Sequence, residues 1–248
     1  MSTATVARGT MPLGDHLREA RTRGTRAAVA LALAVLVGFL VSGQVLDLLR
    51  APIEEIAESR SASLNYDTIT GAFDLKLKIA LFAGIVLSSP FWLLELFAFV
   101  TPGLTRRERR YTYGFVAAAF PLFLAGCAFG FLLFPHMVEM LAGFSSDEDS
   151  TILTATYYVD FVLKIILAIG IAFVLPVFVV VLNLVGVLPA ATLRRSWRVV
   201  VVVIVLFSAL VTPAADVLSM FLVAAPMALL FGLAMLIAHV HDSRKGSA

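Results

Sequence analysis

The sequence predicts an all-α, polytopic membrane protein whose chain crosses the lipid bilayer six times. Hydrophobic residues make up 60% of its 248 residues and charged residues only 15%, whereas about a quarter of the residues in soluble domains are charged. Long apolar segments alternate with polar connections, as in polytopic membrane proteins. The net charge of +2 gives no indication of a nucleic-acid partner. The single cysteine, Cys127, excludes an internal disulfide.

Residues 1–26 are predicted to form a cytoplasmic tail followed by an amphipathic helix on the membrane surface. Apolar side chains recur there at helical spacing, among them Leu13, Leu17 and Ala20, and arginines occupy the other faces. This stretch shows no short apolar region followed by a cleavage site, so we expect no cleavable signal peptide in it.

Residues 27–240 are predicted to form a six-helix transmembrane domain. A helix of about 20 residues crosses the roughly 30 Å hydrocarbon core, and the spans are expected at residues 27–49, 75–100, 113–134, 161–187, 199–211 and 217–238. We expect the last two spans to be short and Pro135 to end the third. Prolines inside the spans are expected to kink their helices: Pro90, Pro121, Pro176 and Pro226.

The fifth segment, residues 199–211, would extend only about 20 Å as a helix, well short of the hydrocarbon core. With residues 217–238 it forms either a re-entrant hairpin or a membrane-spanning pair beside which the bilayer is thinned. Charge does not separate these alternatives, because both place the two flanks of the pair on the same side. We favour thinning, because the segment is apolar throughout and contains no internal Gly or Pro.

The distribution of basic residues predicts the orientation of the chain. Of the 19 Lys and Arg residues, 14 lie before the first span, in the connections at residues 101–110 and 188–198, or in a tail at residues 241–248. Cytoplasmic connections carry an excess of Lys and Arg. Both termini are therefore predicted to be cytoplasmic.

Two carboxylates on this predicted cytoplasmic face are candidates for binding a cationic partner. Glu108 stands among four arginines in the segment F-V-T-P-G-L-T-R-R-E-R-R at residues 99–110, and Glu19 lies on the predicted surface helix. A carboxylate binds a guanidinium group through two parallel hydrogen bonds, so the two acids suit a ligand with two adjacent cationic side chains. The alternative is that both acids only neutralise neighbouring arginines.

Several motifs resemble the TatC family, the receptor core of the twin-arginine protein translocase. H-L-R-E-A-R at residues 16–21 resembles the family motif H-L-x-E-L-R, with alanine in place of the usual leucine. Residues 99–110 resemble the family's first cytoplasmic loop, and A-P at residues 51–52 resembles the start of its first external loop. T-P-A-A-D at residues 212–216 resembles its T-P-x-D turn, with one residue more before the acid. The resemblance runs in order from about residue 12 to residue 238.

The resemblance implies a set of site residues. Glu19 and Glu108 would bind the paired arginines of a signal peptide, Phe99 would shape the same surface, and Arg21 would support the N-terminal helix. Residues expected to bind a partner or to support the structure are Pro52, which would shape an external cap, Glu95 and Asp216.

The resemblance also implies partners and a location. Proteins of this family lie in the bacterial cytoplasmic (inner) membrane and work with single-span partners, TatA and usually TatB. They pass folded proteins outward, driven by the proton-motive force. We therefore expect twin-arginine signal peptides, TatA- and TatB-type proteins, membrane lipid and further copies of this chain as partners.

Two positions depart from the family pattern. Glu95, in the second predicted span, stands where glutamine is common, and Val174 stands where the fourth span often has glutamate. One interpretation is that the polar group has moved from the fourth span to the second. Another is that Glu95, about five residues from the cytoplasmic end of its span, reaches water or is protonated.

A secondary transporter for a small solute is the alternative function. Such transporters show internal repeats and a midplane site built from broken helices with ionisable groups, but the sequence shows no repeat and only Glu95 lies well inside a span. An intramembrane enzyme is disfavoured further, because no histidine–acid cluster, G-x-S-x-G motif or zinc-ligand spacing is present. We therefore predict a receptor that is not an enzyme, with no catalytic residue, metal or cofactor.

Overall fold

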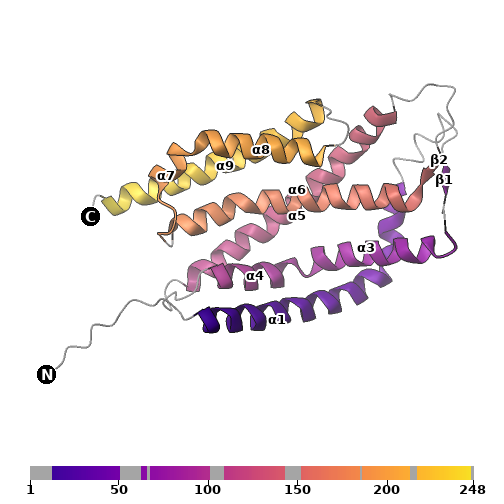
Figure 1. Ribbon diagram of the computed structural model, residues 1–248, viewed down its shortest axis with the longest axis horizontal. Helices are drawn as coiled ribbons and strands as arrows, with labels where there is room; N and C mark the ends of the chain where they lie inside the picture. The colour runs from indigo at the N-terminus through magenta and orange to yellow at the C-terminus, as the bar shows by residue number, and fades with distance from the viewer. Residues whose placement is uncertain are drawn as a thin grey trace.

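The computed structural model describes residues 13–50, 63–65, 68–100, 109–142, 152–184, 186–212 and 217–246. They form a bundle of helices that run roughly along one axis, with two short strands at one end (Figure 1). The elements are α1 (Leu13–Leu40), β1 (Ser63–Asn65), α3 (Gly71–Leu87), α4 (Ser89–Val100), α5 (Arg109–Ala142), β2 (Ile152–Thr154), α6 (Ala155–Leu184), α7 (Ala190–Arg195), α8 (Trp197–Val211) and α9 (Val217–Gly246). The beginning of α1 and the end of α9 lie at the end of the bundle opposite the strands (Figure 1).

The predicted all-α, polytopic class is confirmed, with one small addition. Strands β1 and β2 pair in parallel, with Ser63 opposite Ile152 and Asn65 opposite Thr154. Strands of three residues are too short to show the alternating pattern from which a strand is predicted. The buried Tyr158 hydroxyl donates a hydrogen bond to the carbonyl of Leu49 at 3.1 Å, which ties the start of α6 to the helical residues 42–50.

The surface helix and the first span, predicted as separate helices, are one continuous helix. Helix α1 passes through residue 26 without a break, and its 28 residues extend about 42 Å, beyond the roughly 30 Å hydrocarbon core. Gly24 does not interrupt it, because glycine inside a helix costs only about 1 kcal/mol. The chain turns at Val41, whose N–H still bonds to the carbonyl of Val37 at 3.2 Å, and is helical again over residues 42–50.

Helices α3 and α4 form one bent unit, with an angle of 58° at the break. Pro90 has no N–H and cannot bond to the carbonyl of Val86, and the Ser89 hydroxyl donates to that carbonyl instead, at 2.6 Å. The indole N–H of Trp92 donates to the carbonyl of Ile85 at 3.0 Å. The kink expected at Pro90 is therefore confirmed, and side chains satisfy the carbonyl groups that it exposes.

The other span prolines lie inside uninterrupted helices: Pro121 and Pro135 in α5, Pro176 in α6 and Pro226 in α9. Pro135 does not end its helix, because α5 continues to Ala142, and the membrane boundary of the third span stays a prediction. Neighbouring helices compensate for a proline within a membrane bundle, and α5 is packed closely on α6. A Cβ atom added at Gly126 would lie only 2.9 Å from the Cα of Gly170.

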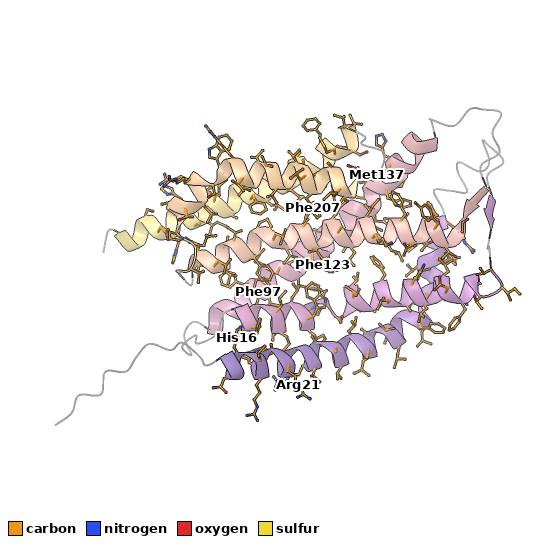
Figure 2. The ribbon with its side chains drawn as sticks, viewed as in Figure 1. His16, Arg21, Phe97, Phe123, Met137 and Phe207 are labelled. Carbon is orange, nitrogen blue, oxygen red and sulfur yellow. The ribbon has the colours of Figure 1, made fainter. Side chains whose placement is uncertain are left out.

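The hydrophobic core lies between α3, α4, α5 and α6. Phe97, Phe123 and Phe134 have no exposed surface, and the Phe97 ring stacks on Phe178 with centroids 4.3 Å apart. Figure 2 shows Phe97 and Phe123 between the helices, where they hold α4 against α5 and α6. The core thus fixes the position of α4, on which Glu95 and Phe99 lie.

The last helix is longer than predicted. Helix α9 has 30 residues, so most of the expected tail at residues 241–248 is helical. Asp242 in its last turns accepts the N–H of Ala190 at 2.8 Å and the side-chain amide of Asn183 at 3.2 Å. A carboxylate is unfavourable at the C-terminus of its own helix but favourable at the N-terminus of another, and Ala190 begins α7. Asp242 therefore anchors α9 to the α6–α7 connection.

Helix α8 is short, as predicted: its 15 residues extend about 22 Å. Its buried residues, Ile204 and Ser208, lie one turn apart, and the helix packs mainly against α9. By length and composition, four helices of the described chain can each span a membrane and the bent α3–α4 pair would be a fifth. A sixth span formed by α8 remains a prediction.

Candidate functional site

The beginning of α1 and the end of α4 meet along a row of charged and aromatic side chains, named here the α1–α4 seam: His16, Glu19, Arg23, Glu95 and Phe99. Arg23 lies at its centre. Its Nε and Nη2 donate to Oε1 of Glu19 at 2.9 and 2.7 Å, and its Nη1 donates to Oε2 of Glu95 at 3.1 Å. The three side chains are only 16–25% exposed, so Arg23 bridges two partly buried carboxylates.

Helix geometry explains one of the two ion pairs of this bridge, the pair between Glu19 and Arg23. Glu19 and Arg23 stand four residues apart on α1, where side chains share one face, and the acid on the N-terminal side gives the favourable order. Both hydrogen bonds from Arg23 go to Oε1 of Glu19. Among the described residues no hydrogen bond reaches its Oε2, so that oxygen can accept a further donor.

Glu95 is not an isolated acid inside the membrane. Besides Arg23, Arg26 places its Nη1 3.8 Å from Oε1 of Glu95. An unpaired charge in the hydrocarbon costs a few kcal/mol or more, and two nearby guanidinium groups offset that cost. Glu95 is thus a structural counter-ion that joins α4 to α1.

The structure does not favour the interpretation that Glu95 replaces a polar group at Val174. Val174 is 3% exposed and lies in the core. Phe97, two residues beyond Glu95, stacks on Phe178 of α6, and residues two apart point to nearly opposite sides of a helix. Helix α4 therefore turns Glu95 toward α1 and Phe97 toward α6.

Phe99 lies one turn beyond Glu95 and continues the seam. Its ring stacks on His16 of α1, with centroids 4.7 Å apart and ring planes 24° from parallel. The two charged groups and the aromatic pair together hold the first turns of α1 against the end of α4. Phe99 therefore lies on the same seam as Glu19, and its role in shaping a signal-peptide surface stays a prediction.

The remaining predicted site residues are placed differently. Arg21 is exposed and takes no part in the bridge formed by Arg23. Glu108, Pro52 and Asp216 lie outside the described residues. Helix α4 ends and α5 begins at the end of the bundle where α1 starts (Figure 1), so the chain on either side of Glu108 reaches the end that carries Glu19.

Sequence reasoning missed two members of the α1–α4 seam, Arg23 and His16, and the contact by which Asp242 anchors α9 to the α6–α7 connection. The four-residue spacing of Glu19 and Arg23 was a usable signal, and so was the acid of Asp242 near a helix C-terminus. In the part of the chain that the structure describes, no group of three or more His, Cys, Asp or Glu residues could hold a metal ion.

The sequence model of the Sec-independent protein translocase protein TatC matches residues 15–226. The chain belongs to the TatC family. Similar proteins include the TatC of Xylanimonas cellulosilytica, 41% identical over 94% of this chain and 86% of that protein. The TatC of Rothia mucilaginosa is 34% identical over 95% of this chain and 81% of that protein.

A crystal structure of a twin-arginine translocase receptor TatC, in DDM, has a similar fold. Its TM-score is 0.77 at 27% identity, and the match covers 90% of this chain and 99% of that one. Membership of the TatC family makes this chain a multi-pass bacterial membrane protein and a non-enzymatic component of the Sec-independent protein translocase. The secondary-transporter alternative is therefore set aside.

Proposed function

We propose that the arginine-rich end of the bundle faces the cytoplasm and binds twin-arginine signal peptides, with Glu19 and Glu108 as the guanidinium acceptors. The observation that supports this most directly is that Glu19 already holds a guanidinium group, that of Arg23, through two hydrogen bonds of 2.7 and 2.9 Å. Arg23 thus stands in for an arginine of the peptide. The free Oε2 of Glu19 offers the first contact to an incoming arginine.

The proposed receptor works within an assembly. TatA- and TatB-type single-span proteins and further copies of this chain are the proposed partners, and the proton-motive force is the proposed energy source. The exposed apolar face of α8, with Val202, Val203 and Leu206 more than half exposed, offers a surface for such a helix or for lipid. The similar crystal structure is that of a twin-arginine translocase receptor, which supports the receptor role.

Photocrosslinking tests the proposed site. A photoreactive residue at Ala20, beside Glu19, should crosslink to an Arg-Arg signal peptide, and excess unlabelled Arg-Arg peptide should compete while a Lys-Lys peptide should not. The control position is Ala191, exposed on α7 at the same end of the bundle. Equal crosslinking at both positions, or equal competition by both peptides, would contradict a site at the α1–α4 seam.

Removal of the internal guanidinium should strengthen peptide binding. In Arg23→Gln, the peptide no longer competes with Arg23 for Glu19, and a partly exposed ion pair is worth about 1 kcal/mol, so affinity should rise roughly five-fold. The matched control is Arg194→Gln, which removes an exposed charge from α7. Titration of a fluorescent Arg-Arg peptide measures both. A fall in affinity for Arg23→Gln would mean that Arg23 supports the site instead of competing for it.

Cysteine labelling tests the orientation. In a Cys127→Ala background, cysteines at Ser61 and Ser146 should react with an impermeant reagent added outside, and cysteines at Thr105 and Ser243 should react only after the membrane is opened. The expectation rests on the 14 basic residues at one end of the helices. Labelling of Thr105 from outside would reverse the orientation and remove the receptor face.

A further inference from the structure

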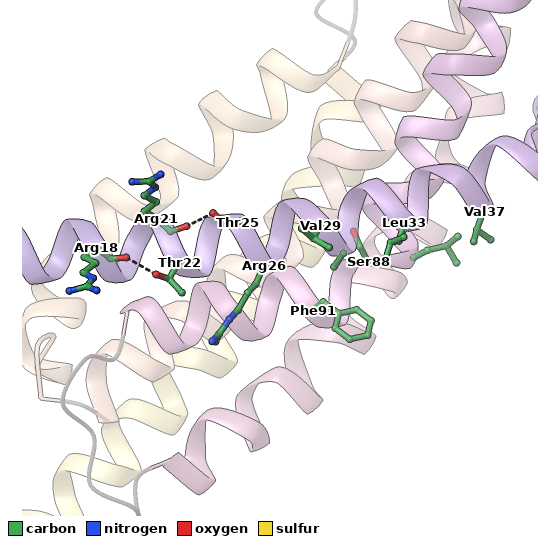
Figure 3. A pocket seen from close by; sticks show the side chains of 13 residues that line it. Arg18, Arg21, Thr22, Thr25, Arg26, Val29, Leu33, Val37, Ser88 and Phe91 are labelled. Carbon is green, nitrogen blue, oxygen red and sulfur yellow. Dashed lines mark hydrogen bonds between the residues drawn. The ribbon is translucent and has the colours of Figure 1, made fainter.

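A groove of about 960 Å³ runs along α1 and past the break between α3 and α4. This volume falls in the range of roughly 300–1,000 Å³ that small-molecule sites occupy. Figure 3 shows Arg18 and Arg21 at one end of the groove and Val37 at the other. None of the groove residues is a member of the α1–α4 seam, and the groove adjoins the seam where Arg26 lies 3.8 Å from Glu95.

The groove is cationic at one end and apolar along the rest. Arg18, Arg21 and Arg26 line the cationic end. Among the described residues no carboxylate pairs with Arg18 or Arg21, and the Arg26 side chain is 67% exposed although it lies 3.8 Å from Glu95. The hydroxyls of Thr22 and Thr25 donate to carbonyls of their own helix. The Arg18 guanidinium and the exposed part of the Arg26 guanidinium thus remain available to one anion.

Large apolar side chains line the rest of the groove and remain open. Leu33 is 61% exposed and Val37 50% exposed on α1, and Phe91 is 63% exposed on α4, across the groove. Ala30 and Ala34 also line the groove, and their small side chains leave room between the larger ones. This surface suits an elongated hydrocarbon chain.

The part of the groove between Arg26 and Val37 matches one leaflet of the bilayer in length. At 1.5 Å per residue, Val37 lies about 16 Å along α1 from Arg26, and half of the hydrocarbon core is about 15 Å. When Arg26 lies at the level of the lipid phosphates, Val37 therefore lies near the midplane.

We propose that this groove binds an anionic phospholipid, with its phosphate between Arg18 and Arg26, which project from the same side of α1 in Figure 3, and one acyl chain along α1 against Phe91. Guanidinium groups bind phosphate oxygens in pairs, and basic sites between transmembrane helices suit anionic headgroups. The unpaired positive charge at one end favours such a lipid over a neutral lipid or an apolar partner helix. The bound lipid fills the space that the α3–α4 break opens beside α1.

The experiment is native mass spectrometry of the purified full chain, delipidated and then titrated with phosphatidylglycerol or phosphatidylcholine. Wild type should bind phosphatidylglycerol about ten-fold more tightly, which corresponds to about 1.4 kcal/mol. Arg18→Gln combined with Arg26→Gln should abolish this preference. Ala34→Phe, which fills the apolar part and keeps all three arginines, should reduce binding of both lipids.

The matched control is Arg194→Gln combined with Arg195→Gln, which removes two exposed charges from α7 and should leave the preference unchanged. An equal loss in this control would mean unspecific attraction between charges and would overturn the proposal. So would a wild type without preference, or a preference that survives both groove variants. Lipid binding is measured separately from signal-peptide binding. A negative result in the lipid titration would therefore leave the proposed receptor function unaffected.

Discussion

Loss of both candidate acids, in Glu19→Gln combined with Glu108→Gln, is expected to weaken binding of an Arg-Arg signal peptide by roughly 30-fold to several hundred-fold. Each peptide guanidinium can form two hydrogen bonds with one carboxylate. The site lies at a wet, arginine-rich surface, so each pair should contribute about 1 kcal/mol, or about 2 kcal/mol where it is partly desolvated. Glu19 is only 25% exposed, so its pair with a peptide arginine should contribute nearer to about 2 kcal/mol.

The same variants should lose the preference for arginine. A lysine ammonium is a point charge without the planar fork of a guanidinium, so wild type should favour Arg-Arg over Lys-Lys although the charge is equal. The double variant should bind both peptides alike. Titrations of both peptides against wild type, the two single variants and the double variant measure this.

Asp15→Asn is the matched control for this experiment, because it removes an exposed acid from α1 one turn before Glu19. It should change affinity only slightly and leave the preference intact. If the double variant kept the full preference for Arg-Arg, both acids would be local counter-ions. Glu19 would then serve only Arg23, and the peptide would be bound elsewhere.

The sequence predicts the helices well because apolar segments of membrane length are unambiguous, but it predicts helix ends poorly. Pro90 breaks its helix and Pro135 does not, although both stand within or at the end of a predicted apolar segment. The difference depends on tertiary partners. At Pro90, Ser89 and Trp92 bond to the exposed carbonyls and stabilise the break. Arg23 and His16 of α1 likewise contact residues of α4 that are distant in the sequence.

The sequence identifies residues of the candidate site but does not predict the contacts between them. Glu19 and Phe99 follow from motif resemblance, and the structure places both on the α1–α4 seam. The hydrogen bond between Arg23 and Glu95 joins residues 72 positions apart in the sequence. No local sequence pattern predicts such a contact. For the same reason Glu95 was interpreted as a lone acid in a span, whereas two arginines from α1 surround it.

Lengthening α8 by four leucines after Leu206 is expected to leave signal-peptide binding intact and to reduce transport of a folded passenger at least ten-fold. The helix has 15 residues, and four more would add about 6 Å. In Figure 1, α8 ends and α9 begins well short of the end that carries the strands. The longer α9 extends past α8 toward the arginine-rich end, so thinning is expected only beside α8 and the first turns of α9.

The physical reason is hydrophobic mismatch. A helix shorter than the hydrocarbon core thins the bilayer at a cost of fractions of a kcal/mol per Å, so relieving about 6 Å of mismatch changes the energy of the thinned state by on the order of 2 kcal/mol. That corresponds to roughly 30-fold in its population. Insertion of four residues rotates the following part of the helix by only about 40°, so Ser208 should still face α9.

The control keeps the length and changes the composition: Val201, Val202 and Val203, all exposed on α8, are replaced together by leucine. Transport should then be close to wild type, because only length governs mismatch. Export of a folded passenger from cells and peptide binding to purified protein are measured for both variants. Unchanged transport in the lengthened variant would show that the short helix serves another purpose than thinning the bilayer. Loss of peptide binding would show that the insertion has disturbed the fold.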